Sequence, residues 1–208
     1  AHPRWEPGAC SSVRQVRGCD CVRDKPKGCR VGVFVPEQGL ADYRGVGVSI
    51  SEQYETAVQH WTDVQKHLPR MVDLVVNLNA QHVIELGVRS GTSTSAWLQG
   101  LSVTGGRLTT VDLLPAPMLE HEGVDWVHIE GDDVSPWVLE QVAARGPAEI
   151  VFVDTSHELE HTEFEIAHYW PLCTKAMVFH DLYLDETGGT RSGPVLRAVD
   201  AFALRGDL

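Results

Sequence analysis

Residues 82–94 have the sequence HVIELGVRSGTST, and this stretch decides the fold class. Its apolar start, His82–Leu86, predicts a short buried strand, and residues 93–101 predict a helix. Gly87 and Gly91 lie between the two, where a tight turn and a close approach of backbone need residues without a side chain. The unpaired N–H groups at the start of the helix can bind an anionic or polar group, although an ordinary strand-to-helix turn has the same pattern.

The alternation of strand and helix continues along the rest of the chain. Further apolar strands are predicted at residues 107–111, 126–129, 149–153 and 176–179, and further helices at 135–145, 158–170 and 194–204. Short apolar strands that are each followed by a helix indicate a parallel sheet covered on both faces. The sequence therefore predicts an α/β protein with a doubly wound, Rossmann-like parallel sheet, in which ligands bind at the carboxyl ends of the strands.

An acidic residue follows every later strand of this pattern. These residues are Asp112 after the second strand, Asp132 and Asp133 after the third, Asp154 after the fourth, and Asp181, next to His180, after the fifth. Because the carboxyl ends of parallel strands meet along one edge of a sheet, the acids are expected to converge on one crevice. A solvated surface does not explain such a repeated placement, so the pattern indicates a functional site.

Residues 52–202 resemble the class I S-adenosylmethionine-dependent methyltransferases. VIELGVRSGTST is similar to their E/D-x-G-x-x-x-G motif, and TTVDL is similar to their second strand with its ribose-binding acid. Residues 153–183, VDTSHELEHTEFEIAHYWPLCTKAMVFHDLY, are similar to the pattern D-x-x-H, helix, W-x-P-L, strand and H-D. This pattern is similar to a subgroup that includes small-molecule and sugar O-methyltransferases and cephalosporin-hydroxylase-like proteins. The resemblance implies an enzyme that methylates a small hydroxylated acceptor.

The resemblance also implies which residues bind S-adenosylmethionine. It assigns the methionine part to Gly87 and Gly91, support of the loop or amino group to Glu85, the ribose hydroxyls to Asp112, and the adenine edge to Asp132 or Asp133. Ser93, in the same motif, completes this predicted set.

A divalent cation is the second group that the resemblance implies. In metal-dependent members, acids at the positions of Asp154 and Asp181 hold the cation, and His180 takes the neighbouring place, where catechol-type enzymes use a carboxylate or an amide. Physical chemistry also favours a metal, because Mg²⁺ lowers the pKa of an acceptor hydroxyl and carboxylate oxygens suit this ion. Without a metal, His157 has to remove the hydroxyl proton, for which an imidazole is suited. Asp154 and His157 are thus the predicted catalytic residues.

The histidines leave another reaction class open. His157 and His161 are four residues apart at a predicted helix start, so they are expected to share a face. With Asp154 they form a set of two imidazoles and one carboxylate for iron or zinc, as in an iron-dependent hydroxylase-like protein. In the other interpretation, His161 is an exposed helix residue and His157 a hydrogen-bonded neighbour of the site.

The composition excludes several classes of protein. The chain has 208 residues, of which 43% are hydrophobic and 22% charged, as in one ordinary globular domain. It has no apolar run near the roughly 20 residues that cross a bilayer and no signal peptide, so we expect a cytoplasmic protein without membrane contact. The net charge of −12 argues against broad nucleic-acid binding.

The first 50 residues lie outside the resemblance. We expect them to form a Cys-rich extension that precedes a methyltransferase-like domain at residues 51–208. Cys10, Cys19, Cys21 and Cys29 can hold Zn²⁺, form two disulfides or remain free thiols, and their spacing matches no usual framework. Residues 1–30 have a net charge of +4, which leaves −12 − 4 = −16 for the rest. We expect the basic residues 1–30 to lie on the acidic remainder of the chain or on an acidic partner, or to be solvated.

Two further expectations concern packing. Residues 54–78 have an apolar stripe at helical spacing that includes Trp61, and Pro69 is expected to divide it into two helices. The side chains of Trp97, Trp126, Trp137 and Trp170 are assigned to packing in the core or at helix ends.

The sequence lacks the antiparallel hairpin that ends a complete class I methyltransferase sheet. An exposed edge strand tends to pair, so we expect a missing C-terminal continuation, a partner that supplies strands, such as a second copy in a homo-oligomer, or an unusually short core. A noncatalytic domain that serves binding or assembly in a larger protein is the remaining alternative function. No sequence pattern in the loops that would bind the small-molecule acceptor identifies this acceptor.

Overall fold

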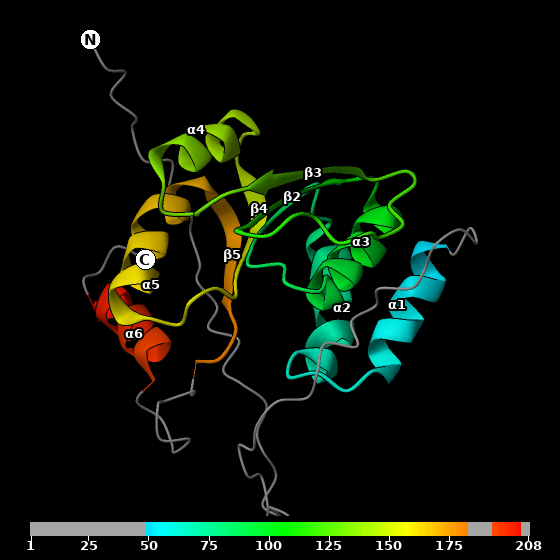
Figure 1. Ribbon diagram of the computed structural model, residues 1–208, viewed down its shortest axis with the longest axis horizontal. Coiled ribbons are helices and arrows are strands. Elements are labelled where there is room, and N and C mark those ends of the chain that lie inside the picture. The colour runs from blue at the N-terminus through cyan, green and yellow to red at the C-terminus, as the bar shows by residue number, and fades with distance from the viewer. Residues whose placement is uncertain (1–48, 183–192, 205–208) are drawn as a thin grey trace, which may run out of the picture.

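A computed structural model of the chain describes residues 49–182 and 193–204 and contains one parallel sheet (Figure 1). The strand order is β3-β2-β1-β4-β5. The strands are β1 (His82–Leu86), β2 (Arg107–Asp112), β3 (Asp125–Glu130), β4 (Ala148–Val153) and β5 (Cys173–Phe179). The predicted doubly wound parallel sheet is confirmed, and within these described ranges no strand follows β5.

Helices cover both faces of this sheet (Figure 1). One face is covered by α1 (Ile50–Gln59), α2 (Leu68–Leu78) and α3 (Thr92–Thr104), and the other by α4 (Pro136–Ala144), α5 (Leu159–Tyr169) and α6 (Pro194–Leu204). Two single 3₁₀ turns, η1 (Gln65–His67) and η2 (Trp170–Leu172), precede α2 and β5.

The central strands are buried on both faces, which explains their continuous apolar sequence. Val83 and Phe152 contribute to the core under α1, α2 and α3. Their chain neighbours Ile84 and Val153 contribute to the core under α4, α5 and α6, because successive side chains of a strand point to opposite faces. The sheet therefore stands as a rigid layer between two apolar cores, and its carboxyl edge is left for the site.

The expected break of the first helical stripe lies elsewhere in the structure. Pro69 stands in the first turn of α2, where its missing N–H costs nothing, so it begins the helix and does not break it. The chain leaves the helix already after α1, and Trp61 in the connection is 85% exposed. Trp137 is 56% exposed in the first turn of α4, so it lies at a helix end and outside the core, whereas Trp97 is fully buried against Phe152.

The order in which the strands are added to the sheet reverses between β1 and β4. Ligands of such sheets bind at this point, beyond the carboxyl ends of the strands. Backbone pairing continues one residue beyond four of the strands. After β3, Gly131 donates to Asp112 O at 2.8 Å. Gly87 donates to Val111 O at 2.9 Å, Asp154 to Leu86 O at 2.9 Å, and His180 to Val153 O at 3.0 Å. The residues after the strands are thus held side by side along one edge, as the sequence predicted.

The Cys-rich extension, with Cys10, Cys19, Cys21 and Cys29 and the zinc and disulfide alternatives, lies outside the described residues. Cys173 is buried at the start of β5. Among the described residues, the structure has no helix of the length and apolar character that membrane crossing requires.

Candidate active site

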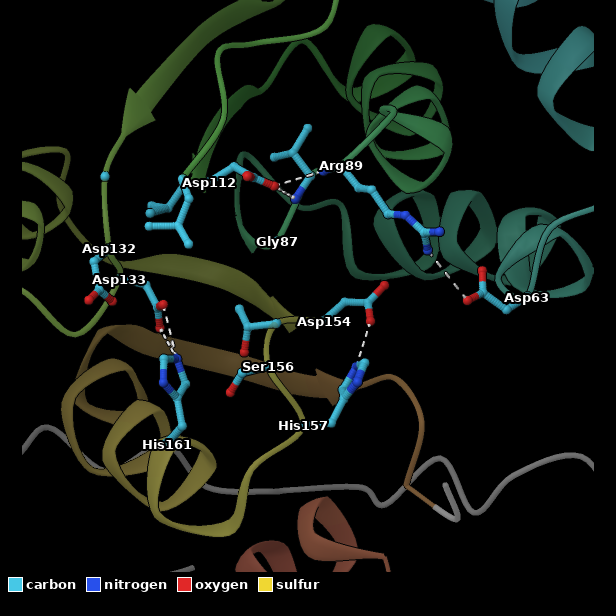
Figure 2. Close-up of a pocket in the computed structure, with 15 residues that line it drawn as sticks. Asp63, Gly87, Arg89, Asp112, Asp132, Asp133, Asp154, Ser156, His157 and His161 are labelled. Atoms are coloured by element: carbon cyan, nitrogen blue, oxygen red, sulfur yellow. Dashed lines mark hydrogen bonds and ion pairs between the residues drawn. The ribbon is translucent and has the colours of Figure 1, made fainter. Parts of the chain in front are cut away.

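A cavity of about 460 Å³ opens at the carboxyl edge of the sheet (Figure 2). Its walls come from the segments after β1, β2, β3 and β4, together with Asp63 from the connection after α1 and His161 from α5. The predicted site residues that line it are Gly87, Asp112, Asp132, Asp133, Asp154 and His157. Residues that are far apart in the sequence therefore share one cavity.

Gly87 allows the segments after β1 and β4 to touch. Its φ is +86°, and a Cβ added at this position would lie 2.0 Å from Asp154 O, well inside van der Waals contact. A side chain here would push away the backbone that carries Asp154. The glycine of the sequence motif thus also fixes an acid that lies 67 residues later in the chain.

Asp112 fixes the shape of the loop after β1 and keeps part of its carboxylate available. Its Oδ2 accepts the backbone N–H groups of Val88 and Arg89, each at 2.7 Å, and its Oδ1 accepts that of Leu114 at 2.8 Å. Partial burial raises the pKa of Asp112, but these three bonds outweigh burial and hold the pKa below its usual value. A carboxylate has about four acceptor positions, so capacity for one more donor remains.

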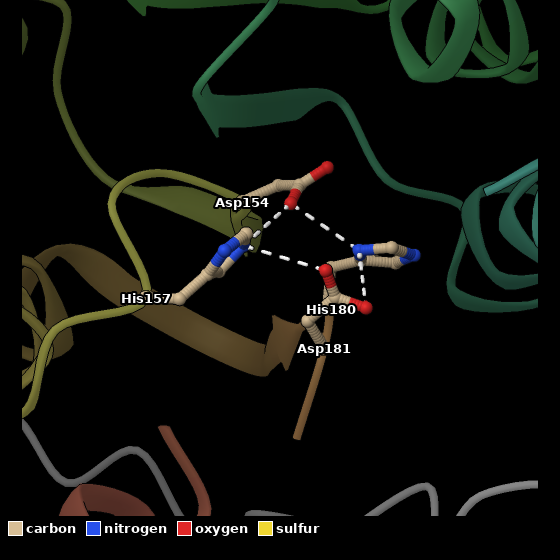
Figure 3. A group of neighbouring side chains, drawn as sticks. All are labelled: Asp154, His157, His180 and Asp181. Atoms are coloured by element: carbon tan, nitrogen blue, oxygen red, sulfur yellow. Dashed lines mark hydrogen bonds and ion pairs between the residues drawn. The ribbon is translucent and has the colours of Figure 1, made fainter. Parts of the chain in front are cut away.

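Asp154, His157, His180 and Asp181 form a four-residue group, here called the βC cluster, in which the side chains point toward one another (Figure 3). Asp154 Oδ1 lies 3.1 Å from His157 Nε2 and 3.3 Å from His180 Nδ1. Asp181 Oδ1 lies 3.3 Å from His180 Nδ1, and its Oδ2 lies 3.8 Å from His157 Nε2. One potential ligand atom of each residue lies within 4.8 Å of the others, which fits a single metal ion.

The βC cluster is strongly charged. Burial raises the pKa of Asp154, but the hydrogen bond from His157 and the charge of His180 outweigh it and lower the pKa to about 2. Burial lowers the pKa of His180, but Asp154 and Asp181 outweigh it and raise the pKa to about 10. The hydrogen bond to Asp154 also raises the pKa of His157. A cation that binds here replaces protons on the imidazoles.

Backbone strain is concentrated around the cavity. His157 has a φ of +58° and Asp181 a φ of +49°, and Arg89 in the cavity wall has a φ of +53°. Such left-handed conformations cost a non-glycine residue of the order of 1 kcal/mol and occur where the side chain must point in a set direction. The predicted pairing of His157 with His161 required both residues to lie on one helix. His157 lies outside α5, because this helix begins only at Leu159.

His161 belongs to a different group, here called the α5 cluster, with Asp133 and Glu165. Its Nε2 lies 3.0 Å from Asp133 Oδ1 and 3.7 Å from Glu165 Oε1. Glu165 is fully buried and accepts the Thr155 hydroxyl, and burial raises its pKa to about 8. The proposed set of His157, His161 and Asp154 is therefore wrong, and His180 is the second imidazole beside Asp154.

The other predicted cofactor residues support the cavity from outside. Glu85 is fully buried, accepts the Thr94 hydroxyl at 2.7 Å, and has a pKa raised to about 8 by burial, so it supports the loop. A Cβ at Gly91 would meet the side chains of Pro117 and Leu119, so this glycine accommodates the loop after β2. Ser93 is buried in the first turn of α3. None of these three residues lines the cavity.

Two residues of the cavity wall were missed by the sequence analysis. Arg89 Nη1 lies 3.9 Å from Asp63 Oδ2 at one side of the cavity, as Figure 2 shows. Arg89 lies inside the glycine motif, and its exposed charge was the available signal. Asp63 lies in an irregular connection, and nothing in its local sequence indicated that it faces the site.

Comparison with known proteins identifies the class. Residues 84–182 match the family model described as "Methyltransferase domain". This stretch of the chain is similar to methyltransferase domains, and the predicted resemblance to the S-adenosylmethionine-dependent methyltransferases is confirmed. No curated protein matches the chain.

Solved structures agree with this assignment at the level of the fold. The chain is similar to the MycE methyltransferase of the mycinamycin biosynthetic pathway, in complex with Mg and SAH, with 23% identity, a TM-score of 0.53, and coverage of 74% of this chain and 43% of that chain. It is also similar to cofactor-bound Rv0187 from MTB, with 17% identity, a TM-score of 0.52, and coverage of 76% and 78%. The chain thus spans less than half of the MycE length.

Proposed function

We propose that the protein transfers the methyl group of S-adenosylmethionine to a hydroxyl oxygen of a small molecule with the help of a divalent cation. The observation that carries this proposal is one continuous cavity with two kinds of wall. Asp112 and Asp132 supply acceptors for ribose and adenine, and Asp154 and His157 supply a charged acid and an imidazole in the same cavity. A methyl donor and an acceptor hydroxyl can therefore meet in one space.

The cofactor assignments follow from which polar groups remain available. Asp132 is exposed in the cavity wall, whereas Asp133 is engaged by His161, so Asp132 is the better partner for the adenine edge. Asp112 retains capacity for a ribose hydroxyl. Arg89 and Asp63 carry opposite charges at the cavity wall and match the carboxylate and ammonium groups of the methionine part.

Asp154, Asp181 and His180 are the residues that would hold the cation. When bound, S-adenosylmethionine would supply the methyl group from its sulfonium, and the cation would lower the pKa of the acceptor hydroxyl. His157 Nε2, which lies 3.1 Å from Asp154 Oδ1, would take the proton of the acceptor hydroxyl as the methyl group passes from sulfur to oxygen. The products are a methyl ether and S-adenosylhomocysteine.

Calorimetry with S-adenosylhomocysteine tests the cofactor site. The wild-type protein should bind this ligand, and Asp112→Ala should weaken binding by about an order of magnitude, because a ribose hydroxyl and three backbone N–H groups lose their acceptor. Leu113→Ala, in the same wall, is the matched control for a change of side-chain size. Equal affinity of the wild-type and Asp112→Ala proteins would contradict the site.

Methyl transfer is tested with S-adenosylmethionine that carries a labelled methyl group and a panel of hydroxylated sugars and polyketides. We expect label in an ether of at least one acceptor class. Binding of S-adenosylhomocysteine without transfer to any acceptor would instead favour a noncatalytic binding domain. A labelled product on nitrogen or carbon would contradict O-methylation.

A further inference from the structure

We propose that the βC cluster binds a first-row transition-metal dication in preference to Mg²⁺, and that Nδ1 of His180 determines this preference. The inference deepens the proposed function, on which it rests for the role of the metal, and it names a different ion from the Mg²⁺ that the sequence suggested. It concerns which cation the side chains of this chain select.

His180 provides the decisive atom. The residue is 8% exposed, and its buried Nδ1 makes no geometrically complete hydrogen bond but lies in ion-pair contact, at 3.3 Å, with an oxygen of each of Asp154 and Asp181. A cation between the carboxylates and this nitrogen would satisfy the nitrogen and both charges at once.

The surrounding structure holds this nitrogen toward the two acids. The backbone N–H of His180 continues the pairing of β5 with β4 through Val153 O. The His67 ring packs edge to face on the His180 ring, with centroids 6.0 Å apart. Asp181, the residue after His180, has a left-handed φ, and its carboxylate also points into the cluster (Figure 3). Two consecutive residues can therefore bind one ion.

The donor set separates the two kinds of cation. Mg²⁺ prefers oxygen ligands in an octahedral arrangement and keeps several waters. Imidazole nitrogen suits cobalt, iron, nickel and zinc, whose affinity for mixed nitrogen and oxygen sites is also higher. Of the three residues that would hold the cation, His180 provides an imidazole nitrogen, and this Nδ1 faces both acids. This nitrogen favours a transition-metal ion over Mg²⁺, which prefers oxygen ligands.

The test measures cobalt and magnesium affinities of the full chain at one pH. Co²⁺ is titrated by its visible absorption, with and without millimolar Mg²⁺, and Mg²⁺ is titrated by calorimetry. The wild-type protein should bind Co²⁺ in the presence of excess Mg²⁺. His180→Asp replaces the nitrogen by an oxygen in the same place and should reduce the ratio of Co²⁺ to Mg²⁺ affinity about tenfold or more.

His161→Asn is the matched control, because it removes an imidazole that lines the cavity and belongs to the α5 cluster, not to the βC cluster. It should leave the cobalt to magnesium ratio of the wild-type protein unchanged. Proton NMR of the cobalt form provides a second readout, since the ring N–H of a coordinated histidine is strongly shifted and exchanges with solvent. One such signal should disappear in His180→Asp and persist in His161→Asn.

Three results would overturn the inference. They are a magnesium affinity equal to that for cobalt, an unchanged ratio in His180→Asp, and loss of cobalt binding in His161→Asn. Thermal unfolding of each metal-free variant identifies a variant that does not fold, and the wild-type comparison of the two ions needs no variant. Calorimetry of S-adenosylhomocysteine without metal separates this inference from the proposed function, because cofactor binding can fail while the metal preference holds, and the reverse.

Discussion

The βC cluster and the α5 cluster are built from the same residue types and differ in almost every physical property. The βC cluster pairs two acids with two histidines after β4 and β5, the pKa of its Asp154 is lowered to about 2, and two of its residues have a left-handed backbone. The α5 cluster pairs two acids with one histidine, and its Glu165 is fully buried with a raised pKa.

The comparison shows that location in the fold decides what an acid and an imidazole do. Three of the βC residues follow the carboxyl ends of strands, where irregular backbone can direct them at a ligand. Two of the α5 residues, His161 and Glu165, lie one turn apart on a regular helix that packs on the sheet. Burial raises the pKa of the helix carboxyl of Glu165, so it keeps its proton at neutral pH, whereas the pKa of Asp154 at a strand end is lowered and its charge is available for chemistry.

Loss of one acid from each cluster should give the largest contrast. Asp154→Asn should lower turnover by a factor of about 10²–10³, because the charge that binds the cation or supports His157 acts mainly in the transition state. Glu165→Gln should retain turnover, since Glu165 does not line the cavity. Steady-state kinetics with labelled cofactor measures both variants. Equal losses would show that the two clusters act as one unit.

A methyl group added at Gly87, next to the backbone of Asp154, should have the next largest effect, in this case on the stability of the fold. Gly87→Ala places a Cβ against Asp154 O and should lower the free energy of unfolding by about 3 kcal/mol or more. Gly105→Ala is the matched control, because Gly105 also has a positive φ but nothing lies within 4 Å of its added Cβ. Its cost should be only about 1 kcal/mol from the backbone conformation. Urea denaturation tests the difference, and similar losses for both variants would refute the close approach.

The two clusters should also respond to opposite ends of the pH scale. The pKa of Glu165 is raised on folding, so its contribution to stability is present below a pH of about 4.5 and is lost as the pH rises to about 8. Glu165→Gln should remove this alkaline loss, which is of the order of 4 kcal/mol at pH 8. The pKa of Asp154 is lowered to about 2, so its contribution is present above a pH of about 3.9 and is lost on acidification, with or without Glu165.

Urea denaturation between pH 3 and pH 8 measures both limbs. The wild-type and Glu165→Gln curves should diverge only on the alkaline side. A divergence on the acid side would mean that Glu165 is ionised in the folded protein.

The smallest expected effect concerns the cavity wall at Arg89. Arg89→Asn, which tolerates the left-handed backbone, should weaken binding of S-adenosylhomocysteine about fivefold to tenfold, and Arg89→Lys should weaken it less. Methylthioadenosine lacks the amino-acid part and should bind all three proteins equally well. Calorimetry of both ligands tests the assignment, which is wrong if the two ligands lose affinity together.

The sequence by itself determined the order of strands and helices and the acids that follow the strands. Short apolar strands, glycines at the first turn and helical periodicity are local patterns, so β1, α3 and the later elements could be read to within a few residues. The convergence of Asp112, Asp132 and Asp154 could also be predicted, because parallel strands end at one edge.

Only the tertiary structure decided which of these residues face one another. Sequence spacing paired His157 with His161, but the left-handed turn at His157 and the start of α5 at Leu159 separated them and brought His180 to Asp154 instead. Nothing near Asp63 or Glu165 in the sequence indicated a place beside the cavity or under it. Such contacts depend on how the helices pack on the sheet, and that packing sums many small contributions from residues far apart in the chain.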